Sequence, residues 1–466
     1  MKYLLLLAIA TSLSANSDPF QLGTQTPSQI TLITEAIEDG VLHPTTLALT
    51  ERDKTALHSA AIGDEVRIEA FTQLSERVTK APFKLSRVAL YAEGATMHVL
   101  DFGVETHRLK TKRMFFLGND GVLGIGFAVD PATGAISGAV LQGSQELSLS
   151  GTLDKIEARI VDRESNPTGG TFTCENDVHS MDIGSKSATT LPSVRDLAAV
   201  KGGDPTYLGV IAVDADNEFM SDKFGNDTTA AQTWIEDLFV KMNVFYERDV
   251  DLRLEIGTTF LRTGSDPYSV ASVGLPMLNE LSEHWRLNHQ SVERLFVSLL
   301  TGRGVGSNSF SGIAWRSSSS TSTYCNKGFI SGPNTVGGFN INGIGSSLST
   351  SFTAQFVGHE NGHNLGSEHT HCYTPPIDMC YASEGGCYSG PLSCPATVSG
   401  NGTIMSYCHF SAGNGGAACG TNDEEFHPTV VGRFSSHIIN DLLPQNGNGE
   451  CIFILADEVI LDTGFE

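Results

Sequence analysis

Residues 359–369 constrain the fold most strongly, and they read His-Glu-Asn-Gly-His-Asn-Leu-Gly-Ser-Glu-His. On a helix, residues four apart face the same way, so His359 and His363 converge, with Glu360 beside the first. A third side chain six residues further on reaches the same point only if the chain turns. Gly366 tolerates the left-handed backbone that such a turn needs. The spacing therefore predicts a helix that ends at a glycine and brings three imidazoles together.

The three imidazoles belong to His359, His363 and His369, and together they are a ligand set for Zn²⁺ at about 2.0–2.1 Å. They leave one tetrahedral position open for water, which is typical of a catalytic zinc site and not of a structural one. Glu360 is then placed to take a proton from the zinc-bound water as it attacks a carbonyl, and to pass it to the leaving amine. The alternative, unrelated surface or core histidines, accounts poorly for five fixed positions.

The five positions match the motif HExxHxxGxxH and resemble the metzincin metallopeptidases. A second likeness is Thr403-Ile404-Met405-Ser406-Tyr407, which is similar to the tight methionine-containing turn below the metal in that family. The resemblance implies that Met405 forms a hydrophobic floor and is not a ligand; ordinary core packing is the alternative. The run Gly362–Gly366 and the nearby cysteines are similar to the reprolysin (adamalysin) family. The resemblance covers most of 205–451 and implies a secreted zinc-dependent endopeptidase acting on protein or peptide substrates.

Two residues depart from the reprolysin pattern. Thr370 follows the third histidine, where reprolysins usually carry Asp, so the resemblance does not say how the next loop is supported. Tyr407 is what astacins and serralysins place two residues after the methionine, where it can approach zinc or the oxyanion. Tyr407 is therefore a candidate transition-state stabiliser, with a packed tyrosine as the alternative. An astacin- or serralysin-like enzyme remains an alternative that the cysteine count and the lack of glycine-aspartate calcium repeats disfavour.

The chain changes pattern near residue 200. Residues 85–165 show short apolar and alternating runs broken by Gly, Asn and Asp, which are typical of strands and turns. Later, runs suited to buried strands alternate with helical spacing, which predicts strands at 207–213, 252–256 and 294–300 and helices at 230–246 and 277–285. This order predicts an α/β fold. The resemblance implies a metzincin-type catalytic domain with a twisted mixed sheet, a long active-site helix and a Cys-rich C-terminal subdomain, preceded by a mainly β propeptide.

Residues 304–351 are dominated by Ser, Gly and Asn, and their composition predicts a flexible loop for most of the segment. The exception is Gly312-Ile313-Ala314-Trp315. The resemblance implies that this run is the edge strand that holds the substrate by main-chain pairing.

The N-terminus has the features of a signal peptide over residues 1–15, with a charged start, an apolar run and small residues at its end. The apolar run is too short to span a bilayer, which takes about 20 residues, and no later run is suited to an anchor. A polar segment at 180–205 contains Arg195 and Lys201, where a protease could cut. We therefore expect a signal peptide (1–15), a propeptide (16–200), a zinc metallopeptidase domain (201–452) and a short tail (453–466) in a secreted protein without a membrane anchor.

Charge narrows the range of partners. The chain carries 29 basic and 53 acidic side chains, a formal net charge of −24, whereas nucleic-acid binders are basic. We expect a monomer that binds no nucleic acid. A non-catalytic adhesion protein that keeps zinc only structurally is an alternative from another class, which the intact Glu360 opposes. Asp214, Asp216 and Glu218 form a candidate Ca²⁺ site, although such carboxylates are often simply solvated.

Nine cysteines are present, an odd number, and eight of them follow residue 320: Cys325, Cys372, Cys380, Cys387, Cys394, Cys408, Cys419 and Cys451. In an exported chain this even set predicts up to four disulfides. The resemblance implies that Cys325 closes onto the C-terminal part, with Cys451 or Cys419 as its partner. Cys174 stands alone before the polar segment. Its thiolate could fill the open zinc position, which resembles the cysteine switch of metzincin propeptides; a buried free cysteine is the alternative.

Overall fold

The computed structural model describes residues 42–74, 83–108, 110–161, 172–174, 205–316, 327–347, 349–397, 399–439 and 452–454. The predicted signal peptide, the segment with Arg195 and Lys201, and both Cys325 and Cys451 lie outside these ranges. Within them, no helix has the length and apolar character needed to cross a membrane.

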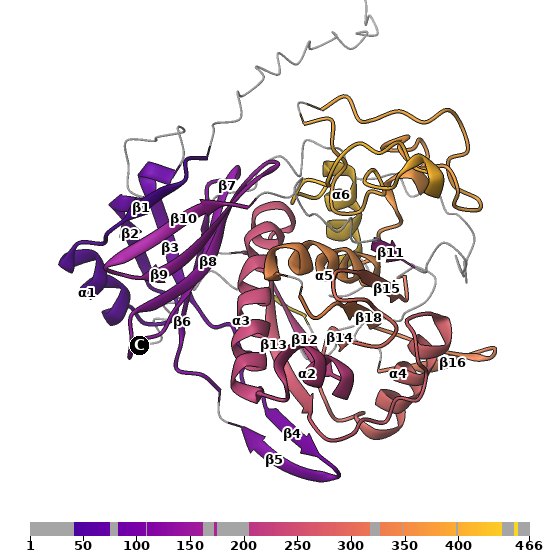
Figure 1. The fold of residues 1–466 in the computed structure, drawn as a ribbon, viewed down its shortest axis with the longest axis horizontal. Coiled ribbons are helices and arrows are strands. Elements are labelled where there is room, and N and C mark those ends of the chain that lie inside the picture. Colours follow the sequence, from indigo (N-terminus) through magenta and orange to yellow (C-terminus); the bar gives the residue numbers. More distant parts are fainter. Residues whose placement is uncertain are drawn as a thin grey trace, which may run out of the picture. The chain divides into compact units, whose positions relative to one another are not determined.

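The first part of the chain forms an eight-stranded antiparallel sheet in the order β1-β10-β9-β8-β7-β6-β3-β2 (Figure 1). One face buries a core that includes Phe116, Ile125 and Phe127, against which Phe71 packs edge-on. The strands and turns predicted over 85–165 are confirmed. The strands are β1 (Thr45–Leu47), β2 (Glu65–Ile68), β3 (Phe83–Val88), β6 (Met114–Asn119), β7 (Leu123–Val129), β8 (Ala135–Gln142), β9 (Gln145–Thr152) and β10 (Lys155–Ile160), with helix α1 (Glu51–Ser59) and the 3-10 helix η1 (Glu69–Leu74) beside them.

The second sheet has the predicted α/β order. Its centre consists of β12 (Tyr207–Ala215), β13 (Leu252–Arg262), β14 (Phe296–Thr301), β18 (Phe339–Ile344) and β15 (Phe310–Ala314). These strands are parallel except β15, which runs antiparallel to β18, and the short β19 (Ile452–Ile454), which joins β12 antiparallel. Both faces are covered, which explains the continuous apolar runs. The helices are α2 (Asn217–Phe224), α3 (Thr228–Phe245), α4 (Leu275–Asn288) and α5 (Thr350–Asn364).

The two faces of this sheet carry different helices. Ile211 and Val213 of β12 share a core with α3 and α5, whereas Ala212 between them packs in the cluster that contains α4 residues. The alternation follows from the two-residue period of a strand. Helix α3 is followed by a π-helical turn, η4 (Tyr246–Val250).

The prediction of flexible loop for most of 304–351 is contradicted in part of the segment, and residues 317–326 lie outside the described residues. Besides the expected edge strand β15, this segment forms the hairpin β16 (Phe329–Ser331) and β17 (Asn334–Val336) and the internal strand β18. All residues of β18 are buried, including two asparagines. Asn340 Nδ2 donates to Asn364 Oδ1 at 2.7 Å, and Asn342 Nδ2 donates to Asn340 Oδ1 at 2.7 Å. Hydrogen bonding lets polar residues occupy a central strand, so composition alone is misleading here.

Strands from before residue 200 complete the second sheet at both edges. Strand β4 (Met97–Asp101) pairs in parallel with β13, and β5 (Val104–Arg108) continues the sheet beyond it. At the other edge, β11 (Phe172–Cys174) pairs in parallel with β15. The sheets also meet through α3: a Cβ on Gly124 or Gly126 would lie 2.5–2.6 Å from methyl carbons of Val244. The expected boundary at residue 200 is therefore not a boundary between separate cores.

The C-terminal part is cross-linked. Three disulfides occur among the described residues: Cys372–Cys387, Cys380–Cys408 and Cys394–Cys419. Cys419 is paired with Cys394, so its candidacy as the partner of Cys325 was wrong. Helices in this part are the 3-10 turns η5 (Thr370–Cys372) and η6 (Ala412–Asn414) and helix α6 (Pro428–His437).

Candidate metal centre

Helix α5 ends as the sequence predicted. Gly366 has φ 98°, the left-handed region. The N–H of Gly366 donates to the carbonyl of His363 at 2.9 Å, and that of Ser367 donates to Gly362 at 3.0 Å. This pair of bonds is the Schellman motif, which reverses the chain after a helix. Arg433 of α6 donates from Nε to the carbonyl of Gly366 at 3.3 Å and supports the turn.

The turn brings the third histidine to the first two. Nε2 of His363 lies 3.1 Å from Nε2 of His359 and 3.1 Å from Nε2 of His369. Each of the three residues is at most 2% exposed. Tetrahedral ligands at about 2.0–2.1 Å from one ion lie about 3.3–3.4 Å apart. The spacing of the three nitrogens fits one small metal ion.

The opposite ring nitrogens are already engaged. Nδ1 of His359 faces the carbonyl oxygen of Ile404 at 2.7 Å, and Nδ1 of His363 faces that of Ser367 at 2.9 Å. A carbonyl only accepts, so each ring carries its proton on Nδ1 and turns the lone pair of Nε2 towards the other rings. Burial lowers the pKa of His359 well below its usual value, and it lowers the pKa of His363 to about 3. Neutral rings with converging lone pairs are the donor set that zinc requires.

The side chain of Glu360 lies against strand β15. The residue is fully buried, and a Cβ on Gly312 of β15 would come within 2.1 Å of its Oε1 and 2.5 Å of its Cδ. Only glycine at position 312 leaves room for the carboxylate. The site thus brings Glu360 next to the strand that was expected to hold substrate.

The methionine turn lies under α5. Met405 is fully buried, and a Cβ on Gly362 would lie 2.6 Å from its sulfur. Thr370, which replaces the usual Asp, ties the third-histidine loop to this turn. Its N–H donates to the carbonyl of Met405 at 3.1 Å, and its hydroxyl donates to Ser406 Oγ at 3.0 Å.

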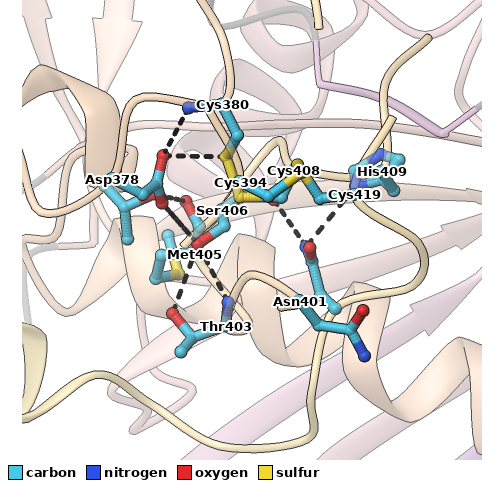
Figure 2. Close-up of a disulfide and its surroundings, with 12 residues drawn as sticks. Asp378, Cys380, Cys394, Asn401, Thr403, Met405, Ser406, Cys408, His409 and Cys419 are labelled. Atoms are coloured by element: carbon cyan, nitrogen blue, oxygen red, sulfur yellow. Dashed lines mark hydrogen bonds between the residues drawn. A yellow bond between two sulfur atoms is a disulfide. The ribbon is translucent and has the colours of Figure 1, made fainter. Parts of the chain in front are cut away.

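A carboxylate is nevertheless present near this turn. Ser406 donates to Asp378 Oδ2 at 2.8 Å, and the N–H of Thr403 donates to Ser406 Oγ at 2.9 Å (Figure 2). Figure 2 shows Asp378 beside the disulfide Cys380–Cys408, which fixes the loop that carries it. Asp378, supplied from eight residues after Thr370, was not found by sequence reasoning, because nothing in its neighbourhood marks it.

Tyr407 packs against the histidines. It is fully buried, its ring centroid lies 4.1 Å from that of His369, and it lies 6.0 Å from His359 in a nearly parallel orientation. The rings of Tyr381 and Phe410 pack against it at steep angles, with centroids 5.0 and 4.9 Å away. These contacts place its ring beside two candidate ligands; its role as a stabiliser stays a prediction.

Two further residues of the centre were missed from the sequence. Oε2 of Glu384 lies 2.7 Å from Nδ1 of His369 and 2.8 Å from Nε2 of His371. Although burial opposes ionisation, both histidines hold the pKa of Glu384 well below its usual value. The spacing His369-Thr370-His371 was the one available signal.

The candidate calcium residues are not all together. The carboxylate of Asp214 accepts hydrogen bonds from Nε and Nη2 of Arg262, at 2.6 and 2.8 Å. The expectation that Asp214 belongs to the candidate Ca²⁺ site was therefore wrong. Asp216 and Glu218 instead lie with Asp266.

The guanidinium of Arg303 lies among these three carboxylates. Its Nη2 is 2.8 Å from Glu218 and 2.8 Å from Asp266, and its Nε is 3.3 Å from Asp216. Burial raises the pKa of Asp216 to about 7. Arg303 thus supplies the positive charge that a cation would bring.

One of the comparisons with known proteins gives a family. Residues 206–415 match the reprolysin-type sequence profile described as metallo-peptidase family M12. No curated protein matches the chain. Among solved structures, the crystal structure of metalloproteinase-II from Bacteroides fragilis is 10% identical, with a TM-score of 0.31, over 69% of this chain and 86% of that one.

Proposed function

We propose that this chain, whose residues 206–415 match metallo-peptidase family M12, is a secreted zinc-dependent metalloendopeptidase made as a zymogen. His359, His363 and His369 would hold the metal. The observation that carries the proposal is the convergence of three Nε2 atoms whose rings are oriented from the other side. When bound, zinc would polarise the scissile carbonyl and make water more acidic at neutral pH.

Glu360 would move the proton. Its carboxylate takes a proton from the attacking water and later gives it to the leaving amine nitrogen. Because it is buried against Gly312, its place relative to β15 is set. A substrate main chain that pairs with β15 would bring its scissile bond to this carboxylate.

The variant Glu360→Ala tests this role. We expect it to retain zinc while casein cleavage falls about 10²–10⁴-fold, the usual contribution of general acid–base catalysis. Glu368→Gln is the control, because that side chain is 38% exposed and pairs with Arg316. Metal analysis accompanies the assay. Cleavage that persists in pure Glu360→Ala protein contradicts the mechanism.

The propeptide proposal gains support from β11. This strand pairs with β15 in the register Cys174↔Gly312, so the expected substrate edge is covered by residues from before position 200. Residues 16–200 would block the site until the chain is cut near Arg195 or Lys201 and β11 leaves β15. N-terminal sequencing of the secreted form, together with metal analysis, tests this. We expect the zinc-containing chain to begin near residue 200 and to carry one zinc. An active form in which residues 16–200 and 201–452 are still one uncut chain contradicts the proposal.

A further inference from the structure

The carboxylate of Glu384 lies between two histidines beside the candidate metal centre. Its Oε2 is 2.7 Å from Nδ1 of His369 and 2.8 Å from Nε2 of His371. Both rings are buried, and their planes are parallel to within 6°. An ionised carboxylate only accepts hydrogen bonds, so each ring donates through the nitrogen that faces it.

This contact distinguishes His369 from the other two candidate ligands. His359 and His363 direct Nδ1 to neutral backbone carbonyls. His369 directs Nδ1 to a charged side chain. A carboxylate partner makes an imidazole a stronger donor to a metal, and it can be removed by mutation.

Cross-links hold Glu384 in this position. The disulfide Cys372–Cys387 joins the residue after His371 to the loop that follows Glu384. The N–H of Cys387 donates to the carbonyl of Glu384 at 3.3 Å, and the N–H of Tyr388 donates to the carbonyl of His371 at 3.1 Å. The carboxylate is therefore fixed before any metal binds.

We propose that Glu384 is a positioning residue of the metal centre, which holds the proton of His369 on Nδ1, directs its Nε2 lone pair to the metal and strengthens that lone pair. His371 holds the carboxylate of Glu384 in place by donating a hydrogen bond from Nε2. His371 lies two residues after His369, and its Nε2 is taken up by the contact with Glu384. The inference rests on the proposed function, since it requires the three histidines to bind zinc.

Zinc affinity of the full-length chain, measured by competition with a chromophoric chelator, tests the inference. Glu384→Ala removes both the acceptor and the charge, and should weaken zinc binding about 10–100-fold. Glu384→Gln keeps an oxygen that can accept both N–H groups and removes only the charge, so its loss should be smaller. Glu368→Gln removes a negative charge one residue before His369 from an exposed side chain, and should change affinity by less than about twofold.

Nitrogen-15 NMR of the histidine rings in zinc-free protein gives a readout that does not depend on activity. Wild type and Glu384→Gln should show His369 protonated on Nδ1, and Glu384→Ala should show a mixture of tautomers. Thermal unfolding of each zinc-free variant checks that it is folded.

The outcomes separate the two proposals. A folded Glu384→Ala protein that binds zinc as tightly as wild type overturns the role of Glu384 and leaves the proposed function intact. If Glu384→Ala does not fold, Glu384→Gln tests the charge alone: unchanged affinity overturns the strengthening of the His369 lone pair by that charge, and a loss of several fold supports it. A wild-type chain that binds no zinc overturns the proposed function itself.

Discussion

Gly312 affects the candidate active site through the side chain that it lacks. A Cβ at this position would lie 2.1 Å from Oε1 of Glu360, closer than any non-bonded contact allows. Glu360 is fully buried in α5, so it has little room to move aside. Either the carboxylate or β15 must shift if position 312 gains a methyl group.

We expect Gly312→Ala to lower kcat/KM by about 100-fold, since a displacement near 1 Å in an active site has that effect. Zinc content should be unchanged, because the atoms nearest to the new methyl group belong to Glu360 and not to the three histidines. Gly413→Ala is the control, since a Cβ there meets nothing closer than 4.0 Å. Peptide cleavage and metal analysis decide the outcome; full activity in Gly312→Ala would show that Glu360 is not constrained by β15.

Among the secondary-structure elements, those with a clear period were predictable. The apolar run 207–213, the helical spacing over 230–246 and the histidine motif became β12, α3 and the end of α5. Strand β18 was not predictable, because its Asn340 is satisfied by Asn361 and Asn364 on α5, which are distant in sequence. Glu384 and Asp378 were not identified from the sequence for a related reason. Each lies on a loop whose path depends on disulfide pairing, and cysteine spacing does not determine that pairing.

Strand β11 allows two explanations of latency to be separated. Cys174→Ala removes the thiol and leaves the backbone, whereas Thr173→Pro removes a backbone N–H and disturbs the pairing with β15. If the thiol is the inhibitor, uncleaved Cys174→Ala should cleave a fluorogenic peptide at least about tenfold faster than uncleaved wild type. If strand pairing is the inhibitor, uncleaved Thr173→Pro should show this increase instead. Uncleaved protein of both variants as inactive as wild type would contradict both explanations.

At the scale of the whole described chain, the parts before and after residue 200 share buried charges. The guanidinium of Arg113 forms ion pairs with two carboxylates on α3: Nη1 lies 3.0 Å from Oε2 of Glu236, and Nη2 lies 2.6 Å from Oδ1 of Asp237. Glu236 is fully buried. Removing one partner of such a pair costs about 3–5 kcal/mol, because a charge stays buried without compensation.

We therefore expect the two fragments to stay associated after a cut between 195 and 201. They should co-elute in size-exclusion chromatography under native conditions and separate only in denaturant. Arg113→Ala should weaken that association and lower the melting temperature of the uncut chain. Arg67→Ala is the matched control, because Arg67 is 57% exposed and pairs only at the surface with Glu65. Wild-type fragments that separate spontaneously would refute this prediction.

The addition of β4 to β13 also bears on how the chain acquires its structure. Thr259 pairs with Met97, about 160 positions earlier, and pairings of such long range slow folding. A chain that starts after residue 200 lacks β4 and leaves the outer edge of β13, an eleven-residue strand, without its neighbour. A long unpaired edge is a template for intermolecular pairing. Strand β4 would thus protect the edge of β13 from intermolecular pairing, and so from aggregation, while the sheet forms.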